Sequence, residues 1–371
     1  MWKYGENGDT IILDSVPKRR LKVTGTRLAG ILGLNKWTTP FQMWCEITKC
    51  ARPPFEDTIY TIAGKAIEPK QISYTKDVVS NYILSPKEFF GNRYQDVKYD
   101  FYPEEKIFGG MWDAKSVMPS GKTATIFEYK TTKRAEDWLQ GPPTYYLIQA
   151  LEYAYLEGIK TGHRPRSIVM VVSFLEENDY NNPQDYEVNN ENTQMFSYPV
   201  NNTFINIDTG DVYISEDRTA PVGYFDIDEL IDLAESWYDR HINSGISPKF
   251  DETKDKEYLD ILRTTSPSND NDVNSIVARA NEIIKKIEEI KASTNLDSLE
   301  KELKSCEKAI KDDLIKSLGD NDTKAVIGNY TLSKTVKKIE TIDKEQMEID
   351  GVLDRYITFD EKETYTLRKK K

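Results

Sequence analysis

The alternation of apolar and polar residues predicts an α/β protein with strands near the middle of the chain. Residues 106–118 and 123–131 have strand patterns and are separated by turn residues, 119–122. The apolar run 167–174 predicts a buried strand, and 82–102, rich in aromatic residues, is expected to be mainly β. Residues 1–21 are expected to be extended.

Helices are predicted where apolar residues recur every three to four positions behind capping residues. These segments are residues 24–33, 39–49, 58–79, 136–139, 145–158 and 226–243. Gly33 ends the first, and Pro40 suits the first turn of the second. The stretch 176–203, rich in Asn, Asp and Tyr, predicts a loop or excursion. The fold expected for residues 1–250 is a mixed central sheet flanked by helices.

The last third of the chain has a different pattern. A polar stretch within 251–272 predicts a linker. Residues 273–318 show heptad-like apolar spacing in two segments, which predicts an antiparallel helical hairpin arm for packing or oligomerisation. Residues 319–371 predict a small β-rich element of short strands.

Composition excludes several classes of protein. With 38% hydrophobic and 30% charged residues, the chain is too apolar for global disorder and too polar for an integral membrane protein. The start, MWKYGENGDT, lacks the pattern of a secretion signal, so secretion is not expected. Three cysteines are too few for a disulfide framework and fit a reducing, cytoplasmic location.

The number of histidines and the net charge limit which metal sites and which modes of nucleic-acid binding are expected. Two histidines, His163 and His241, argue against a zinc site or a His-based nucleophile, so a bound metal is expected to use oxygen ligands. Mg²⁺, Mn²⁺ and Ca²⁺ are then favoured. The net charge of −12 argues against unspecific coating of nucleic acid but leaves a nuclease with a local basic groove open.

Residues 108–132 contain the most informative carboxylates. Side chains alternate along a strand, so Glu128 and Lys130 point to one face. If the hairpin turns at 120–121, paired residue numbers add to 241 and Asp113 lies opposite Glu128. Two opposed carboxylates about 4.5–5.5 Å apart at Cβ repel unless a divalent cation bridges them. A slip of one residue breaks this pairing, and a surface hairpin with a solvated ion pair is the alternative.

Lys130 would lie beside such an ion. Its ammonium group is expected either to orient or help deprotonate an attacking water, or to stabilise charge that develops on a phosphate.

Four sequence motifs together resemble a known nuclease family. Asp113 with Glu128-Tyr129-Lys130 resembles the PD-(D/E)XK restriction-endonuclease-like core. Residues 64–69 resemble its acidic helix motif, and 145–153 resemble its following helix with Gln and Tyr four apart. Residues 25–34 with 39–44 look like the opening of the YqaJ-like viral recombinases, relatives of phage lambda exonuclease. The motifs occur in the expected order within about residues 22–250.

The resemblance implies a metal site. Asp113 and Glu128 would be ligands, and the main-chain carbonyl of Tyr129 would be another. Glu68 would hold a second ion or an ion-bound water, and Lys130 would handle the attacking water. Mg²⁺ or Mn²⁺ is the implied cofactor.

The resemblance also implies residues that contact DNA. Gln149 would position the water or the scissile phosphate. Thr26 and Arg27 match the region that meets the DNA end, and Arg27 has the geometry of a bidentate phosphate donor.

The implied function is a metal-dependent exonuclease that degrades linear duplex DNA from 5′ to 3′ and prepares ends for phage-type recombination. Implied partners are DNA, a single-strand annealing protein and further copies of the chain, in the cytoplasm of a bacterial host of a phage or prophage. Two alternatives stay open. One is an endonuclease, or a nuclease for another substrate, within a phage, defence or replication complex. The other is a noncatalytic DNA-binding assembly subunit.

Overall fold

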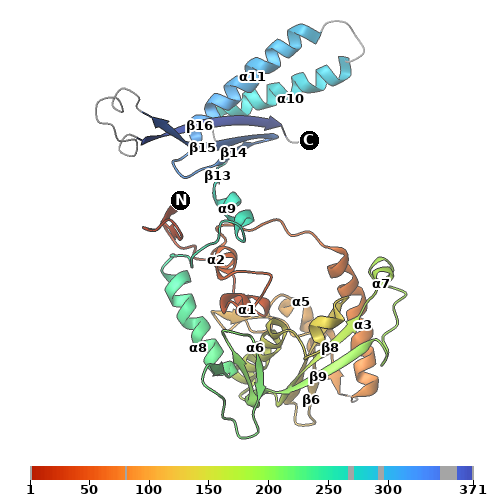
Figure 1. The fold of residues 1–371 in the computed structure, drawn as a ribbon. Helices are drawn as coiled ribbons and strands as arrows, with labels where there is room; N and C mark the ends of the chain where they lie inside the picture. The colour runs from red at the N-terminus through yellow and green to blue at the C-terminus, as the bar shows by residue number, and fades with distance from the viewer. Residues whose placement is uncertain (1, 80–81, 266–270, 291–295, 343–356, 370–371) are drawn as a thin grey trace. The chain divides into compact units, whose positions relative to one another are not determined.

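The chain forms two compact units, Met1–Asp255 and Lys256–Lys371, and each is described by itself (Figure 1). The computed structural model describes residues 2–79, 82–265, 271–290, 296–342 and 357–369.

A five-stranded mixed sheet forms the centre of the first unit. Its strand order is β4-β6-β7-β8-β9. The strands are β4 (Ile83–Leu84), β6 (Ala114–Val117), β7 (Thr123–Thr132), β8 (Ser167–Phe174) and β9 (Thr193–Pro199). β7 and β8 are parallel, and the other neighbouring pairs are antiparallel. The predicted mixed central sheet flanked by helices is confirmed.

Two long helices lie on opposite faces of this sheet, α3 (Ile59–Val78) and α6 (Thr144–Thr161) (Figure 1). Phe127 and Tyr129 of β7 share a buried cluster with Ile72 of α3. Glu128, between them in sequence, points to the other face and contacts α6. The sheet therefore brings β7 between two helices that both carry candidate site residues.

Shorter elements surround this layer. The other helices are α1 (Thr26–Ile31), α2 (Pro40–Thr48), α4 (Pro86–Phe90), α5 (Tyr94–Val97), α7 (Glu177–Asn181) and α8 (Ile227–Trp237), with the short helical turns η1 (Gly91–Arg93), η2 (Ala135–Trp138), η3 (Val200–Asn202) and the π-helix η4 (Tyr238–Asn243). The other strands are β1 (Trp2–Tyr4), β2 (Ile11–Leu13), β3 (Val23–Thr24), β5 (Phe108–Gly109), β10 (Thr203–Asn206), β11 (Val212–Ile214) and β12 (Tyr224–Phe225).

The predicted helix signals hold in the first unit. Gly33 has φ +74° just beyond α1, and the Thr39 hydroxyl accepts the Gln42 N–H at the start of α2. Leu230 and Ile242 are buried, one in α8 and the other in η4.

Two predictions for the first unit are wrong. Residues 82–102 are mainly helical rather than β, because Ser85 and Glu88 form a capping box and Pro86 starts α4. The stretch 176–203 contains α7 and β9 instead of only a loop. β9 pairs with β8 along seven residues, so it extends the sheet.

The second unit joins helices and strands around one core. It contains α9 (Lys256–Leu262), α10 (Asn271–Ile290) and α11 (Leu296–Ser317) and a sheet of order β13-β14-β15-β16. The strands are β13 (Thr264–Thr265), β14 (Lys324–Ile327), β15 (Tyr330–Ile342) and β16 (Ile357–Lys369). Buried residues of α10, α11, β14 and β15 form one cluster. The predicted helix pair and β-rich element therefore share a single core.

Three details of the second unit differ from the sequence predictions or lie beyond the described residues. α9 occupies part of the range for which a linker is predicted, because Leu259 and Leu262 are buried on one helical face. β15 and β16 each have 13 residues, so they are long strands and not short ones. Residues 266–270, 291–295 and 343–356 of the predicted linker, hairpin turn and tail lie outside the described residues.

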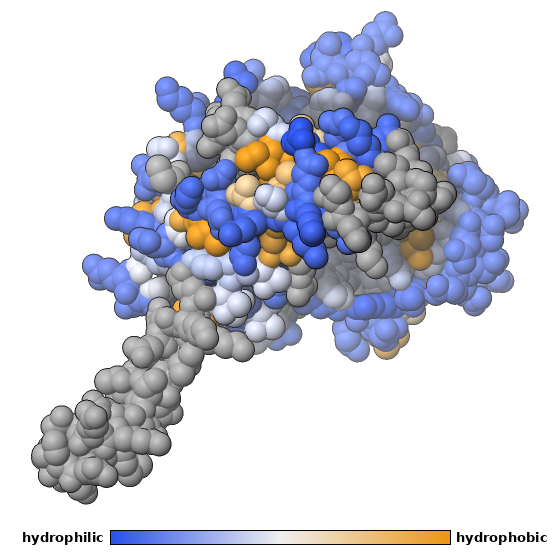
Figure 2. Space-filling model, turned by 90° about the horizontal axis from the view of Figure 1, so that it is seen from above, coloured by the Kyte–Doolittle hydropathy of each residue, from blue (hydrophilic) through white to orange (hydrophobic). Residues whose placement is uncertain are grey.

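Hydrophilic and hydrophobic residues both reach the surface. Figure 2 shows one face on which hydrophilic residues surround small groups of hydrophobic ones. Within the described residues, every helix is too short or too polar to cross a lipid bilayer.

Candidate active site

Glu128 is a completely buried carboxyl group in the middle of β7. Its Oε2 atom lies 3.1 Å from Nζ of Lys130 and accepts a 3.0 Å hydrogen bond from Nε2 of Gln149. Its Oε1 atom has no hydrogen-bond partner among the described residues. Burial, followed by the nearby charge of Asp113, raises the pKa of Glu128 well above its usual value. The surroundings therefore disfavour the charged form of Glu128, and a further cation beside it would favour that form.

Asp113 lies immediately before β6, beside β7. Its Oδ2 atom accepts a 2.9 Å hydrogen bond from the main-chain N–H of Tyr129. The neighbouring pairs Ala114–Phe127 and Lys115–Ile126 have the predicted register. Asp113 itself comes before the strand, so its side chain bonds to the backbone of β7. Its charge still acts on Glu128, so the two predicted carboxylates lie in one site.

Lys130 completes the pattern on β7. Burial lowers its pKa, but the carboxylates of Glu128 and Asp113 outweigh that effect and raise the pKa above its usual value. The ammonium group also lies 5.1 Å from the ring centroid of Tyr146 on α6. The two carboxylates and the Tyr146 ring therefore hold the Lys130 ammonium group in place.

Glu68 reaches the same region from α3. Burial and the charge of Asp113 raise its pKa to about 7, while Lys130 acts in the opposite direction. Pro69 follows it inside the helix and has no N–H to donate to the carbonyl four residues earlier. A pocket of about 400 Å³ has Glu68 and Pro69 in its wall. Glu68 therefore lies beside open space.

Gln149 and Tyr153 are one helical turn apart on α6. Nε2 of Gln149 lies 3.3 Å from the Tyr153 hydroxyl, in addition to its bond to Glu128. Gly25 is packed against both, since a Cβ atom there would lie 2.7 Å from the Tyr153 hydroxyl oxygen and 2.9 Å from Cγ of Gln149. Gly110 has φ +148°, and a Cβ atom there would lie 2.3 Å from Cε1 of Tyr153. Two glycines therefore hold this face of α6 in place.

Thr26 and Arg27 begin α1. Thr26 is exposed, whereas Arg27 is partly buried and already has partners. Its Nε atom lies 3.2 Å from Glu46, and its Nη1 atom donates to the Thr24 hydroxyl at 2.9 Å and to the Lys22 carbonyl at 3.2 Å. Among the described residues, Nη2 has no hydrogen-bond partner. Arg27 is held in one orientation with one nitrogen left for a ligand.

The donor set fits a divalent ion such as Mg²⁺ or Mn²⁺. In the described part of the chain, no three His, Cys, Asp or Glu side chains converge on one point. Asp113 and Glu128 nevertheless form a pair of carboxyl groups, and no described residue bonds to Oε1 of Glu128. Mg²⁺ often takes one or two carboxylates, with waters and substrate phosphates as the remaining ligands.

Glu152 is a site neighbour that sequence reasoning missed. It is fully buried on α6, and within the described ranges neither carboxyl oxygen has a hydrogen-bond partner of normal geometry. Burial raises its pKa well above the usual value, while the Gly25 backbone and the Arg27 charge oppose the shift. The available signal was its position three residues after Gln149, which puts it near that face of the helix.

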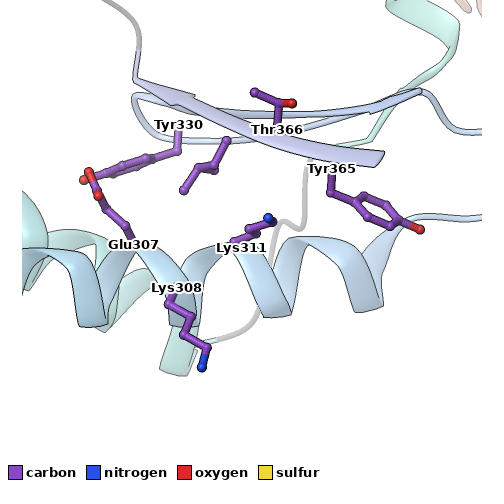
Figure 3. A pocket seen from close by; sticks show the side chains of 7 residues that line it. Glu307, Lys308, Lys311, Tyr330, Tyr365 and Thr366 are labelled. Carbon is purple, nitrogen blue, oxygen red and sulfur yellow. The ribbon is translucent and has the colours of Figure 1, made fainter. Parts of the chain in front are cut away.

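A pocket in the second unit offers different chemistry. It has a volume of about 430 Å³ between α11 and strands β15 and β16. Figure 3 shows Glu307 directed toward Tyr330, with Lys311 facing the strands. Its labelled charged groups are one carboxylate and two lysines, so it lacks the paired carboxylates found beside β7.

Comparisons with known proteins give distant relatives. No protein-family model matches the chain. An uncharacterized protein of Mycoplasma pneumoniae, the MG373 homolog, is 26% identical over 281 residues, covering 64% of this chain and 86% of its own. The uncharacterized protein MG373 of Mycoplasma genitalium is 22% identical over 274 residues, covering 62% and 84%. A solved phage-related exonuclease from Haemophilus somnus 129PT matches 60% of this chain and 96% of its own, with 14% identity and a TM-score of 0.35.

Proposed function

We propose that this protein is a metal-dependent nuclease that hydrolyses phosphodiester bonds in DNA. The observation that carries the proposal is the buried Glu128 carboxyl group, with Asp113 beside it and the Lys130 ammonium group 3.1 Å away. In the described part of the chain, one of its oxygens has no hydrogen-bond partner. Burying a charged group costs on the order of several kcal/mol unless opposite charges or hydrogen bonds offset that cost. This group of charges therefore does not stabilise the fold by itself. A divalent cation would compensate it.

Asp113 and Glu128, together with the main-chain carbonyl of Tyr129, would hold the ion, and Glu68 would serve a second ion or a water from its place on α3. When bound, Mg²⁺ there neutralises phosphate charge and makes water a better nucleophile. This set of oxygen donors supports assignment of the core to the PD-(D/E)XK type that its motifs resemble.

The protein's own residues orient the reaction. Lys130, fixed by Glu128 and the Tyr146 ring, stabilises the negative charge that builds up on the phosphate. Gln149 is held by Glu128 and Tyr153, so its amide is positioned to orient a water or a phosphate oxygen. Thr26 and Arg27 would meet the DNA end.

The finer function is a 5′ to 3′ exonuclease of the YqaJ-like and lambda-exonuclease type that prepares ends for recombination. It rests on the joint order of the four motifs in the sequence. A single-strand annealing protein and further copies of the chain are partners of the same proposal.

Cleavage of linear and circular duplex DNA, with Mg²⁺ or with EDTA, tests the function. We expect loss of linear DNA only, and only with Mg²⁺. Glu128→Gln and Lys130→Ala should each lower the rate by about 100-fold or more. Lys65→Ala is the control, because Lys65 lies on α3 but is 67% exposed and paired with Asp57.

Nicking of circles would instead identify an endonuclease. DNA binding without cleavage would identify a noncatalytic subunit, and normal turnover by Lys130→Ala would refute the assigned site.

A further inference from the structure

A pocket of about 350 Å³ adjoins the candidate active site. Its wall includes Trp37, Tyr60, Lys133, Arg134 and Tyr146, and we call these five residues the aromatic groove. β7 runs directly from Lys130 toward Lys133, so the two lie within roughly 10 Å along the chain. Tyr146 belongs to both places, because its ring also contacts Lys130.

Flat aromatic surfaces in this groove are open to solvent. Trp37 is 59% exposed and Tyr60 is 47% exposed. Large aromatic residues are usually buried, so two of them at one pocket suggest a ligand with flat faces. Tyr60 is supported from behind by the Tyr180 ring, at 4.9 Å between centroids. The Tyr60 ring is therefore supported on one side, and both rings are accessible.

Cations accompany these rings. The Arg134 guanidinium lies 5.0 Å from the Trp37 ring centroid, and the Lys133 ammonium lies 5.7 Å from that of Tyr60. Lys133 also has a long ion pair with Glu177 at 3.5 Å. Arg134 is exposed and, among the described residues, has no carboxylate within ion-pair distance. The one acid in the pocket wall, Asp137, is paired with Lys36 at 2.8 Å.

We infer that the aromatic groove binds a single strand of DNA next to the cleavage site, with bases stacked on Trp37 and Tyr60 and phosphates at Lys133 and Arg134. Unpaired bases expose the faces that such rings require, whereas bases within a duplex cover them. The chain has a net charge of −12, whereas the groove carries the cations Lys133 and Arg134. This local positive charge favours an anionic ligand. This inference rests on the proposed function, since it names the form of the substrate at the same site.

Binding of a fluorescein-labelled oligothymidylate, followed by anisotropy in EDTA, tests the inference without hydrolysis. Trp37→Ala and Arg134→Ala should each weaken binding by roughly fivefold or more. Arg134→Ala should also make the salt dependence shallower by about 0.7 in log–log slope, because one phosphate contact is lost. Trp37→Ala should leave that slope unchanged.

The matched control is another exposed ring with its own cation. Tyr99 is 80% exposed, lies outside the groove and has Lys98 at 4.8 Å from its ring centroid. Tyr99→Ala should bind the oligonucleotide like the unmodified protein. Circular dichroism of each variant checks folding, and Tyr60→Ala gives an independent loss if Trp37→Ala does not fold.

The results distinguish binding at the aromatic groove from the proposed cleavage activity. Absence of binding by the unmodified protein, unchanged binding by both groove variants, or equal loss in Tyr99→Ala would overturn the inference. Loss of binding confined to the groove variants supports it even if no DNA is cleaved, and in that case only the proposed catalytic function fails.

Discussion

Gln149 of α6 donates a 3.0 Å hydrogen bond to Oε2 of Glu128 on β7, and Oε1 of the same carboxyl group is buried without a partner among the residues that the structure describes. This relationship links the helix that follows the sheet to the strand that carries the acid. It also leaves one oxygen free for a cation. The expected behaviour of several variants follows from this arrangement and from the contacts around it.

Gly25→Ala tests the support of Gln149. The new methyl group would lie within 3 Å of Tyr153 and Gln149, at a backbone with φ +34°. We expect a loss of about 1–3 kcal/mol in the free energy of unfolding and at least a tenfold loss of cleavage, because Gln149 is displaced. Gly121→Ala is the control, since Gly121 has φ +80° but no atom of the described residues lies within 4 Å of the added Cβ. Equal activity losses in both variants would contradict the packing argument.

Glu152→Gln tests the buried acid of α6 through pH. Burial raises the pKa of Glu152, so between its unfolded and folded pKa values the folded protein binds more protons than the unfolded chain. The stability of the unmodified protein therefore falls as pH rises through that window.

Glu152→Gln removes this term, so its melting temperature should exceed that of the unmodified protein more at about pH 8 than at about pH 5. Thermal unfolding at both pH values, without metal, measures it. Glu235→Gln on α8 is exposed and should show no such trend. A constant difference between the two pH values would rule out a raised pKa for Glu152.

Lys115→Met tests a buried ion pair between β6 and α6. Lys115 and Glu157 are 2.6 Å apart and each about 3% exposed, and Thr123 donates to the same carboxylate oxygen at 2.6 Å. Removing the lysine leaves a buried carboxylate, so urea unfolding should show a loss of about 3–5 kcal/mol. Lys65→Met breaks an exposed pair and should cost less than about 1 kcal/mol. Similar small losses in both would show that the buried pair is solvated.

Arg27→Gln tests recognition of the DNA end. Arg27 is fixed by Glu46 and Thr24, and its remaining nitrogen is suited to a terminal phosphate. On 5′-phosphorylated linear DNA the variant should be slower by about tenfold or more, whereas 5′-hydroxyl ends should be cleaved at a nearly unchanged rate. Arg164→Gln is the control, since Arg164 forms an exposed pair with Asp228. A uniform loss on both ends would indicate a structural role for Arg27.

Local sequence patterns were sufficient to predict most of the strands and helices that carry the site residues. The turn at 119–122 and the alternation in β7 gave the pairing of Ala114 with Phe127. They did not show that β6 begins one residue after Asp113, because the end of a strand depends on tertiary contacts. The hydrophobic pattern also failed to predict α4. Aromatic residues at 82–102 favour strands, but the capping box at Ser85 stabilises a helix there.

Contacts between distant segments were beyond sequence reasoning. The approach of Gly25 to Tyr153, and of Trp37 to Arg134, joins residues about a hundred or more apart, and no local period encodes it. The predicted segments placed Glu68 and Gln149 on helices and Glu128 and Lys130 on a strand. That Oε1 of Glu128 has no partner among the described residues could be learned only from the fold.

Anomalous diffraction from a crystal soaked in Mn²⁺ tests the central claim most directly. The account predicts a manganese peak in contact with both Asp113 and the free oxygen of Glu128, and its loss in Glu128→Gln. A map with no peak between these two carboxylates, under conditions in which DNA is cleaved, would contradict it.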